Sequence, residues 1–129
     1  VQTCALPIST QRLGRLVGRS KAIEYMIEGA KMGVDDALLA GIVNKVFEAE
    51  SNEAFIKQVV AYGRRFCPPT GAPLAVGRIK RAVQSGLEGG LEQGLALERE
   101  LQAELFRSND AKEGFAAFTE KRKATFRGR

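Results

Sequence analysis

Residues 91–107 constrain the fold most, because their apolar side chains cover too much of a helix for a single contact face. At helical spacing these side chains span about half of the circumference. They are Leu91, Leu95, Leu97, Leu101, Leu105 and Phe106. A surface helix usually buries a narrower stripe. We therefore predict a long helix over residues 91–107 that packs against two neighbours.

Glu98 lies in the middle of this apolar arc. A carboxylate buried without a partner costs free energy, so it should pair with a cation. The last predicted helix places four residues on one face: Ala111, Phe115, Phe118 and Arg122. We therefore predict a structural ion pair between Glu98 and Arg122, in preference to a catalytic role for Glu98.

Turn and capping residues divide most of the chain into helices. They predict helices over residues 10–17, 21–28, 35–40, 51–66, 73–86, 91–107 and 109–123. Ser20 is the expected cap of the second helix, and Ser108 that of the last. Only residues 42–47 have strand character. The chain should therefore be mostly α-helical, with at most one short strand.

Composition places the chain in the ordinary globular class. Its 129 residues are 44% hydrophobic and 27% charged, which favours one globular unit. No stretch reaches the roughly 20 apolar residues that cross a bilayer, so we expect no membrane partner. The two cysteines, Cys4 and Cys67, suit a reducing compartment, and we expect a cytoplasmic protein. Without histidine, acid–base chemistry near neutral pH would need a perturbed carboxylate, lysine, tyrosine or thiol.

Positive charge is concentrated towards the two ends of the chain. The net charge is +5; residues 10–23 hold four basic residues and no acid, and residues 112–129 hold six basic residues against two acids. Such segments are typical of solvated faces, or of a surface that attracts nucleic acid or a phosphorylated small molecule. A basic helical nucleic-acid-binding module is therefore a remote alternative. Because no recognised nucleic-acid motif is present, we expect no such partner.

Three blocks of the sequence form a recognisable pattern. They are residues 10–18 (TQRLGRLVG), 41–46 (GIVNKV) and 113–123 (EGFAAFTEKRK). In this order and at this spacing they resemble the second half of the enoyl-CoA hydratases, in the enoyl-CoA hydratase/isomerase (crotonase) superfamily. The departures are small: Gly14 stands where the family usually has proline, and Gly33 where it usually has a serine or threonine cap.

The resemblance covers residues 10–129 and implies a fold. It implies the mostly α-helical C-terminal part of the α/β crotonase fold, which is also called ClpP/crotonase-like. Residues 10–66 would be the end of the crotonase core domain. Residues 67–129 would be a C-terminal helical region that forms trimers and covers the acyl-CoA pocket.

The resemblance also implies chemistry on an acyl-CoA thioester. In the family two backbone N–H groups stabilise the enolate oxygen, and in hydratases two glutamates add water to a trans-2-enoyl-CoA to give a 3-hydroxyacyl-CoA, as in fatty acid β-oxidation. These groups lie upstream of Thr10, so we assign no catalytic residue and no metal site to this chain and expect it to be inactive alone. No cofactor is implied, since coenzyme A is part of the substrate. An enoyl-CoA isomerase or another crotonase-family acyl-CoA enzyme is the alternative.

Phe118 and Lys121 are the binding residues that the resemblance implies. In the family the matching aromatic residue and lysine approach coenzyme A, commonly across a subunit boundary of a homo-trimer, or of a hexamer built as a dimer of trimers. Positions i and i+3 are neighbours on a helix and would place a ring for adenine beside a cation for phosphate. Core packing of Phe118 and a solvated charge at Lys121 remain open. A non-catalytic element that trimerises through residues 91–107 is a further alternative.

The first nine residues are predicted to be foreign to the domain. Read back into codons, residues 1–8 match a short-read sequencing adaptor that continues into the codon of Ser9. We therefore expect residues 1–9 to be adaptor-derived and non-native, and the native sequence to start in the middle of a domain. Cys67 would then be the genuine thiol. An unusual natural terminus is the alternative.

Overall fold

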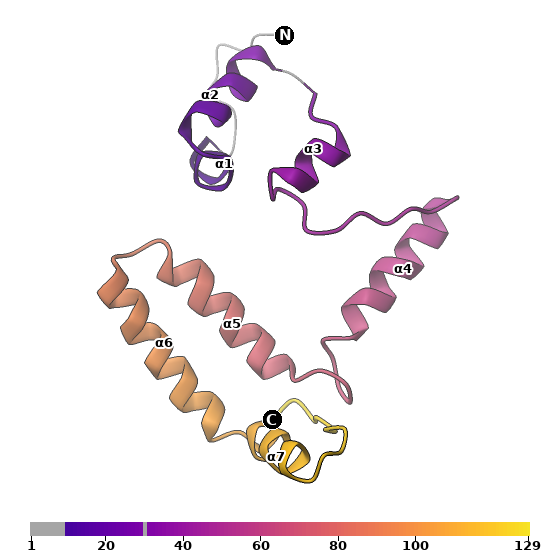
Figure 1. The fold of residues 1–129 in the computed structure, drawn as a ribbon, viewed down its shortest axis with the longest axis vertical. Coiled ribbons are helices and arrows are strands. Elements are labelled where there is room, and N and C mark those ends of the chain that lie inside the picture. The colour runs from indigo at the N-terminus through magenta and orange to yellow at the C-terminus, as the bar shows by residue number, and fades with distance from the viewer. Residues whose placement is uncertain (1–9, 30) are drawn as a thin grey trace. The chain divides into compact units, whose positions relative to one another are not determined.

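The computed structural model describes residues 10–29 and 31–129. These residues form seven helices and no strand, and they divide into two compact units, of which the second is Glu50–Arg129 (Figure 1). The predicted adaptor-derived segment, residues 1–9, lies outside the described residues. Across the described ranges, every helix is too short or too polar to cross a membrane.

The first unit contains α1 (Thr10–Val17), α2 (Arg19–Glu28) and α3 (Val34–Leu39). Helices α1 and α2 pack against each other and bury Ala22. Gly18, with φ of +83°, is the N-cap of α2, so Ser20 lies inside the first turn and the predicted Ser20 cap is wrong. A positive φ is accessible to glycine, and it lets the chain turn between two helices without a longer loop.

The strand predicted over residues 42–47 does not form in this chain. The backbone N–H groups of Ile42 and Val43 both donate to the carbonyl oxygen of Ala37, at 2.9 and 3.2 Å. A strand needs a neighbouring strand for its remaining backbone hydrogen bonds. Residues 10–29 and 31–129 contain no strand that could serve as this partner. Residues 42–47 therefore have the side chains of a strand but form no strand in this structure.

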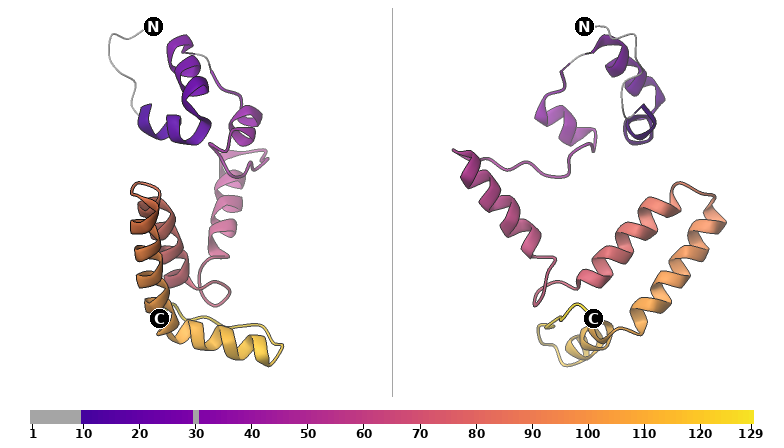
Figure 2. Two further views of the ribbon diagram at one scale, coloured as in Figure 1. Left: turned by 60° about the vertical axis from the view of Figure 1, so that its left-hand side comes forward. Right: turned by 180° about the vertical axis from the view of Figure 1, so that it is seen from behind.

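The second unit contains α4 (Asn52–Arg64), α5 (Pro73–Gly86), α6 (Leu91–Phe106) and α7 (Asn109–Thr119). Figures 1 and 2 show α5 and α6 running side by side as a helical hairpin, with α7 crossing beyond the end of α6. The Ser51 side chain caps α4 by accepting from the N–H of Ala54, and Ser108 caps α7 in the same way from Ala111. These caps satisfy helix N–H groups that lack an intrahelical partner.

Helix α6 contacts both α5 and α7, as its wide apolar arc predicts. Leu101 is the best buried side chain of the arc, with 2% of its surface exposed. Near the hairpin turn Gly94 approaches Gly86 so closely that a Cβ atom at Gly94 would lie 3.3 Å from the Gly86 carbonyl oxygen. At the other end Arg78 forms a bidentate pair with Glu104, with an Nε–Oε2 distance of 2.7 Å. The contact between the two glycines and the ion pair together fix how α5 and α6 are aligned along the hairpin.

The predicted ion pair between Glu98 and Arg122 is wrong. Glu98 is exposed to solvent, so its carboxylate needs no protein partner. Arg122 lies beyond the end of α7, which terminates at Thr119 instead of near residue 123, and it pairs with Glu113 and Glu120. The helical stripe that would have placed Arg122 beside α6 therefore stops before reaching it.

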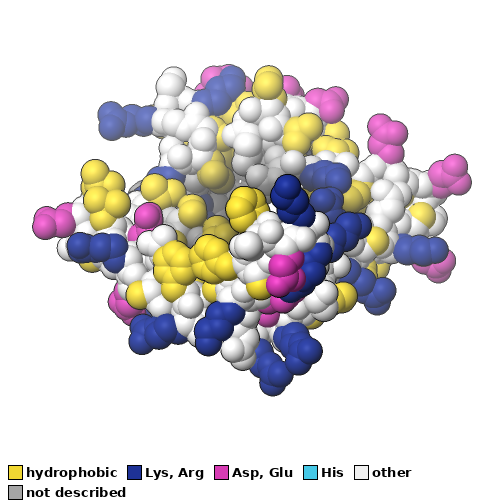
Figure 3. Space-filling view, turned by 60° about the horizontal axis from the view of Figure 1, so that its bottom comes forward, with side chains coloured by type: hydrophobic (Ala, Val, Ile, Leu, Met, Phe, Trp, Pro, Cys, Tyr) yellow, Lys and Arg dark blue, Asp and Glu magenta, His cyan; other side chains and the backbone are white. Residues whose placement is uncertain are grey.

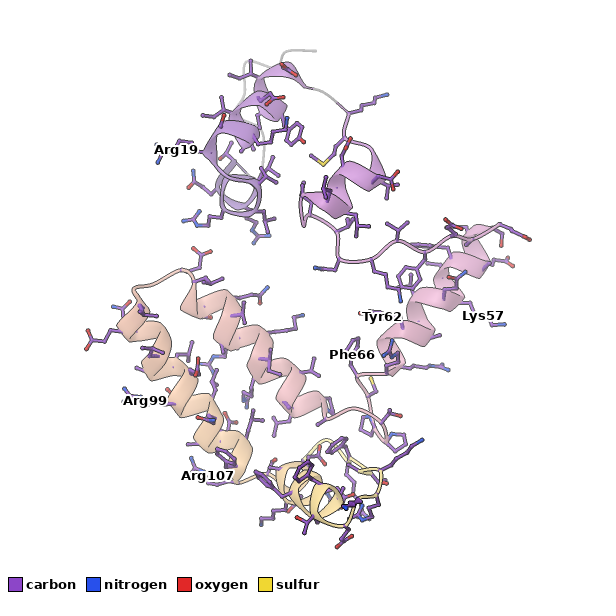
Figure 4. All side chains as sticks on the ribbon, in the orientation of Figure 1. Arg19, Lys57, Tyr62, Phe66, Arg99 and Arg107 are labelled. Atoms are coloured by element: carbon purple, nitrogen blue, oxygen red, sulfur yellow. The ribbon has the colours of Figure 1, made fainter. Side chains whose placement is uncertain are left out.

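Large apolar side chains remain exposed on every helix of the second unit. The exposed set includes Phe55, Ile56, Val59 and Val60 on α4, Ile79 and Val83 on α5, Leu91, Leu95 and Phe106 on α6, and Phe115 and Phe118 on α7. Within the second unit, α4 packs against none of the other helices. Figure 4 labels Tyr62 and Phe66 on α4 and in the segment after it, where their rings meet edge to face at 5.4 Å. Apolar surface of this extent is typical of faces that another protein surface covers.

Candidate functional site

An apolar groove of about 500 Å³ lies where α6 meets α7. Aromatic and small residues line it: Gln102, Leu105, Phe106, Ala111, Gly114, Phe115 and Phe118. The rings of Phe106 and Phe115 stack with centroids 6.0 Å apart and planes inclined by 11°. On the face that carries α7, apolar side chains gather next to lysine and arginine side chains (Figure 3). The groove can therefore accept a flat or apolar group while cations lie nearby.

Phe118 lies on the wall of this groove with 86% of its surface exposed. Core packing and ligand contact were both open for Phe118. Its exposure excludes core packing within the second unit. Its ring is free to contact a ligand or another chain. Aromatic rings with this exposure offer stacking area at a small cost in conformational entropy.

Lys121 occupies the turn that ends α7. Its φ is +55°, a left-handed conformation in which glycine is usual. The N–H of Lys121 donates to the Phe118 carbonyl at 3.3 Å, and the N–H of Arg122 donates to the Ala117 carbonyl at 3.0 Å. This pair of bonds is the Schellman pattern that closes a helix. Phe118 and Lys121 are therefore close in the chain. The prediction that they are i, i+3 neighbours on one helix is wrong, because Lys121 lies beyond the end of α7.

Arg122, next to Lys121, is bound by two carboxylates. Its guanidinium reaches both oxygens of Glu113, at 2.5 and 3.0 Å, and its Nε donates to Glu120 at 2.6 Å. Glu113 also accepts from the N–H of Thr125 at 2.8 Å. Arg122 and the Thr125 amide lower the pKa of Glu113 to about 2, and the two carboxylates raise the pKa of Arg122. Residues 113 and 122 are too far apart in sequence for a helical pair, so no sequence signal pointed to this contact.

Asp110 holds the end of the chain against the start of α7. It is a buried carboxylate, 5% exposed, and its two oxygens accept from the N–H groups of Arg127 and Gly128 at 2.7 and 2.8 Å. The Asp110 N–H donates to the carbonyl of Arg129 at 3.0 Å. Both oxygens are thus engaged, and Asp110 is structural. The sequence did not predict this role of Asp110, because the donors are backbone N–H groups, which leave no pattern in the side chains.

The pKa of Glu113 predicts how the segment after α7 responds to acid. Because the folded-state pKa is depressed, the ion pair contributes stability above pH 4.5, and this contribution is lost as the pH falls through about 2. We expect amide hydrogen exchange of residues 120–127, corrected for the intrinsic rate, to be constant above pH 4.5 and to accelerate below it. Glu113→Gln should be fast at every pH. A flat profile for the parent chain down to pH 2 would contradict the assignment.

The remaining acids form no cluster of the kind that binds a metal in residues 10–29 and 31–129. No group of three or more cysteines, aspartates or glutamates that could hold a metal occurs there. Asp110, the buried acid of these residues, is fully occupied by backbone N–H groups. Together with the exposed groove and the basic turn, these features define a helical region that presents apolar and cationic surface.

The sequence matches a known family along almost its whole length. The model of the enoyl-CoA hydratase/isomerase family matches residues 4–129. The chain belongs to this family, and the resemblance drawn from the three sequence blocks is confirmed.

Curated relatives and solved structures agree with this assignment. The chain is 34% identical over 118 residues to the mitochondrial enoyl-CoA hydratase of Pongo abelii, and this match covers 92% of this chain and 39% of that protein. It is 35% identical to the 2,3-dehydroadipyl-CoA hydratase of Escherichia coli, covering 93% of this chain and 45% of that protein. A crystal structure of an enoyl-CoA hydratase from Geobacillus kaustophilus superposes with a TM-score of 0.83 at 40% identity, over 94% of this chain and 44% of that one. The chain thus spans about two fifths of the length of the proteins it matches.

Proposed function

We propose that this chain is the C-terminal part of an enoyl-CoA hydratase, a lyase that adds water to a trans-2-enoyl-CoA to give a 3-hydroxyacyl-CoA. One observation carries the proposal. At 40% identity, 94% of this chain superposes on 44–45% of two enoyl-CoA hydratase structures, with TM-scores of 0.83 and 0.84. The whole protein would act on acyl-CoA thioesters, as in fatty acid β-oxidation.

The contribution of this chain to such an enzyme is surface for coenzyme A. Coenzyme A combines a planar adenine with several phosphates. The exposed ring of Phe118 offers stacking area, and Lys121 offers a cation at the adjoining helix end. Lys123, Arg127 and Arg129 would form a basic rim that attracts the phosphates. We propose no metal and no cofactor besides the coenzyme A of the substrate.

The catalytic groups would come from a part of the hydratase fold outside these residues. Water addition needs a general acid and a general base beside the substrate, and N–H donors aimed at the thioester oxygen. We propose that neither the occupied carboxylate of Asp110 nor the other acids of the described residues supply these groups. An enoyl-CoA isomerase remains the rival, since the matching family is named for both activities. Two glutamates at the hydratase positions of the upstream coding sequence would support hydration, and their absence would exclude it.

Assembly and location are further parts of the proposal. Exposed apolar faces on α4, α5, α6 and α7 suit burial against the rest of the subunit and against other subunits, in a trimer or a dimer of trimers. The exposed free thiol of Cys67 suits a reducing compartment, and we propose a cytoplasmic location. Three of the matched relatives are named as mitochondrial proteins, from Pongo abelii, Arabidopsis thaliana and Dictyostelium discoideum.

Binding of coenzyme A tests the two proposed contact residues. We expect the chain to bind coenzyme A weakly and in a salt-sensitive way, and Phe118→Ala and Lys121→Gln each to weaken binding by roughly tenfold, the scale of a lost ring stack or phosphate contact. Equilibrium dialysis would measure this. The matched controls are Leu39→Ala, an exposed apolar residue of the first unit, and Lys57→Gln on α4. Equal losses in variants and controls would contradict the assignment.

A further inference from the structure

One carboxylate on α7 holds the segment that follows the turn carrying Lys121. Glu113 binds the side chain of Arg122, the residue after Lys121, and it accepts from the backbone N–H of Thr125 further along. We propose that Glu113, acting through Arg122, is a positioning residue that fixes Lys121 for contact with a phosphate of coenzyme A. This inference rests on the proposed function and adds residues that make no contact with the ligand themselves.

The turn needs such support because its conformation is unfavourable for lysine. Left-handed backbone brings Cβ of an L-residue close to the following carbonyl, so helices usually place glycine at this position. The two Schellman hydrogen bonds close the helix, but the segment after them has no helix or strand of its own. The bidentate contact to Arg122 and the contact to the Thr125 amide tie this segment back to α7. Bidentate arginine–carboxylate pairs within a network are the surface ion pairs that contribute most to order.

The same network separates the roles of the two neighbouring cations. The charge of Arg122 is compensated by Glu113 and Glu120, at 2.5 and 2.6 Å. Lys121 is exposed, and in the part of the chain that the structure describes no salt bridge engages its ammonium group. Arg122 therefore orders the turn, while Lys121 keeps its full charge available to an anion. A phosphate is the group that this unpaired, fixed cation fits.

Two measurements on the 129-residue chain test this inference. The first is amide hydrogen exchange of residues 120–127 in Glu113→Gln, with Glu100→Gln, an exposed acid on α6, as the control. We expect Glu113→Gln to accelerate exchange about five- to tenfold and Glu100→Gln to change nothing. The second is the dissociation constant of coenzyme A for Glu113→Gln in the parent chain and in a Lys121→Gln background. We expect a loss of about threefold to tenfold in the parent and none in the Lys121→Gln background.

The outcomes separate the inference from the proposed function. Unchanged exchange in Glu113→Gln would overturn the inference, and so would an equal loss of coenzyme A affinity in both backgrounds, because a general structural role predicts that result. A parent chain that binds no coenzyme A would overturn the proposed coenzyme site. In that case accelerated exchange in Glu113→Gln would still support the hold of Glu113 on the turn. If Glu113→Asp restores both slow exchange and coenzyme A affinity, the effect depends on the negative charge at this position and not on the length of the side chain.

Discussion

Gly71→Ala is expected to disrupt the loop between α4 and α5 and to destabilise the second unit by about 2–4 kcal/mol. A Cβ atom at this position would lie 2.4 Å from the carbonyl carbon of Phe66 and 2.7 Å from the carbonyl oxygen of Arg65. Both are backbone atoms, so no side chain can rotate away to make room. The Gly71 N–H also donates to the Cys67 carbonyl at 2.8 Å, which holds the glycine against that segment. The loop must therefore move as a whole.

Movement of this loop should also reach the end of the chain. The Phe126 N–H donates to the carbonyl of Pro69 at 2.9 Å, and Gly128 lies against Pro68 and Pro73. We expect faster amide exchange in α5 and in residues 125–129 of Gly71→Ala. Gly77→Ala is the matched control, because nothing lies within 4 Å of a Cβ atom there and alanine favours the helix by up to about 1 kcal/mol. Similar exchange in the two variants would show that the loop tolerates the added methyl group.

Most of the helices could be predicted from local signals. Ser108 caps α7 as expected, and α4 and α5 begin at the predicted places, with Ser51 as the cap of α4 and Pro73 as the first residue of α5. Two predictions failed for different reasons. Residues 42–47 have the side chains of a strand but lack a partner strand among the described residues. Helix α7 ends early because Lys121 adopts a left-handed conformation that lysine rarely adopts.

The candidate site could be predicted only in part. Phe118 and Lys121 followed from the resemblance to a family, and their role in binding stays a prediction. The contacts from Glu113 to Arg122 and from Asp110 to the backbone of Arg127 and Gly128 join a helix to an irregular segment. Neither contact has the spacing of a helix or a strand, and half of the donors are backbone N–H groups, which every residue except proline carries.

The chain alone is expected not to hydrate an enoyl-CoA. Intact enzymes accelerate reactions by roughly a million-fold or more, which requires positioned acids and preorganised N–H donors around the reacting atoms. Asp110 is the buried carboxylate of the described residues, and two backbone N–H groups occupy its oxygens at 2.7 and 2.8 Å. The groove between α6 and α7 is lined by apolar side chains and Gln102, with no acid among them. We therefore expect such a surface to bind coenzyme A without activating water.

Hydration of crotonyl-CoA by the purified 129-residue chain, followed through loss of the enoyl thioester absorbance, tests the central claim most directly. Coenzyme A binding, measured on the same sample, shows that the surface is intact. We predict binding without turnover above the uncatalysed rate. Turnover at the rate of an intact hydratase would contradict the account, because the catalytic acids would then have to lie among these residues.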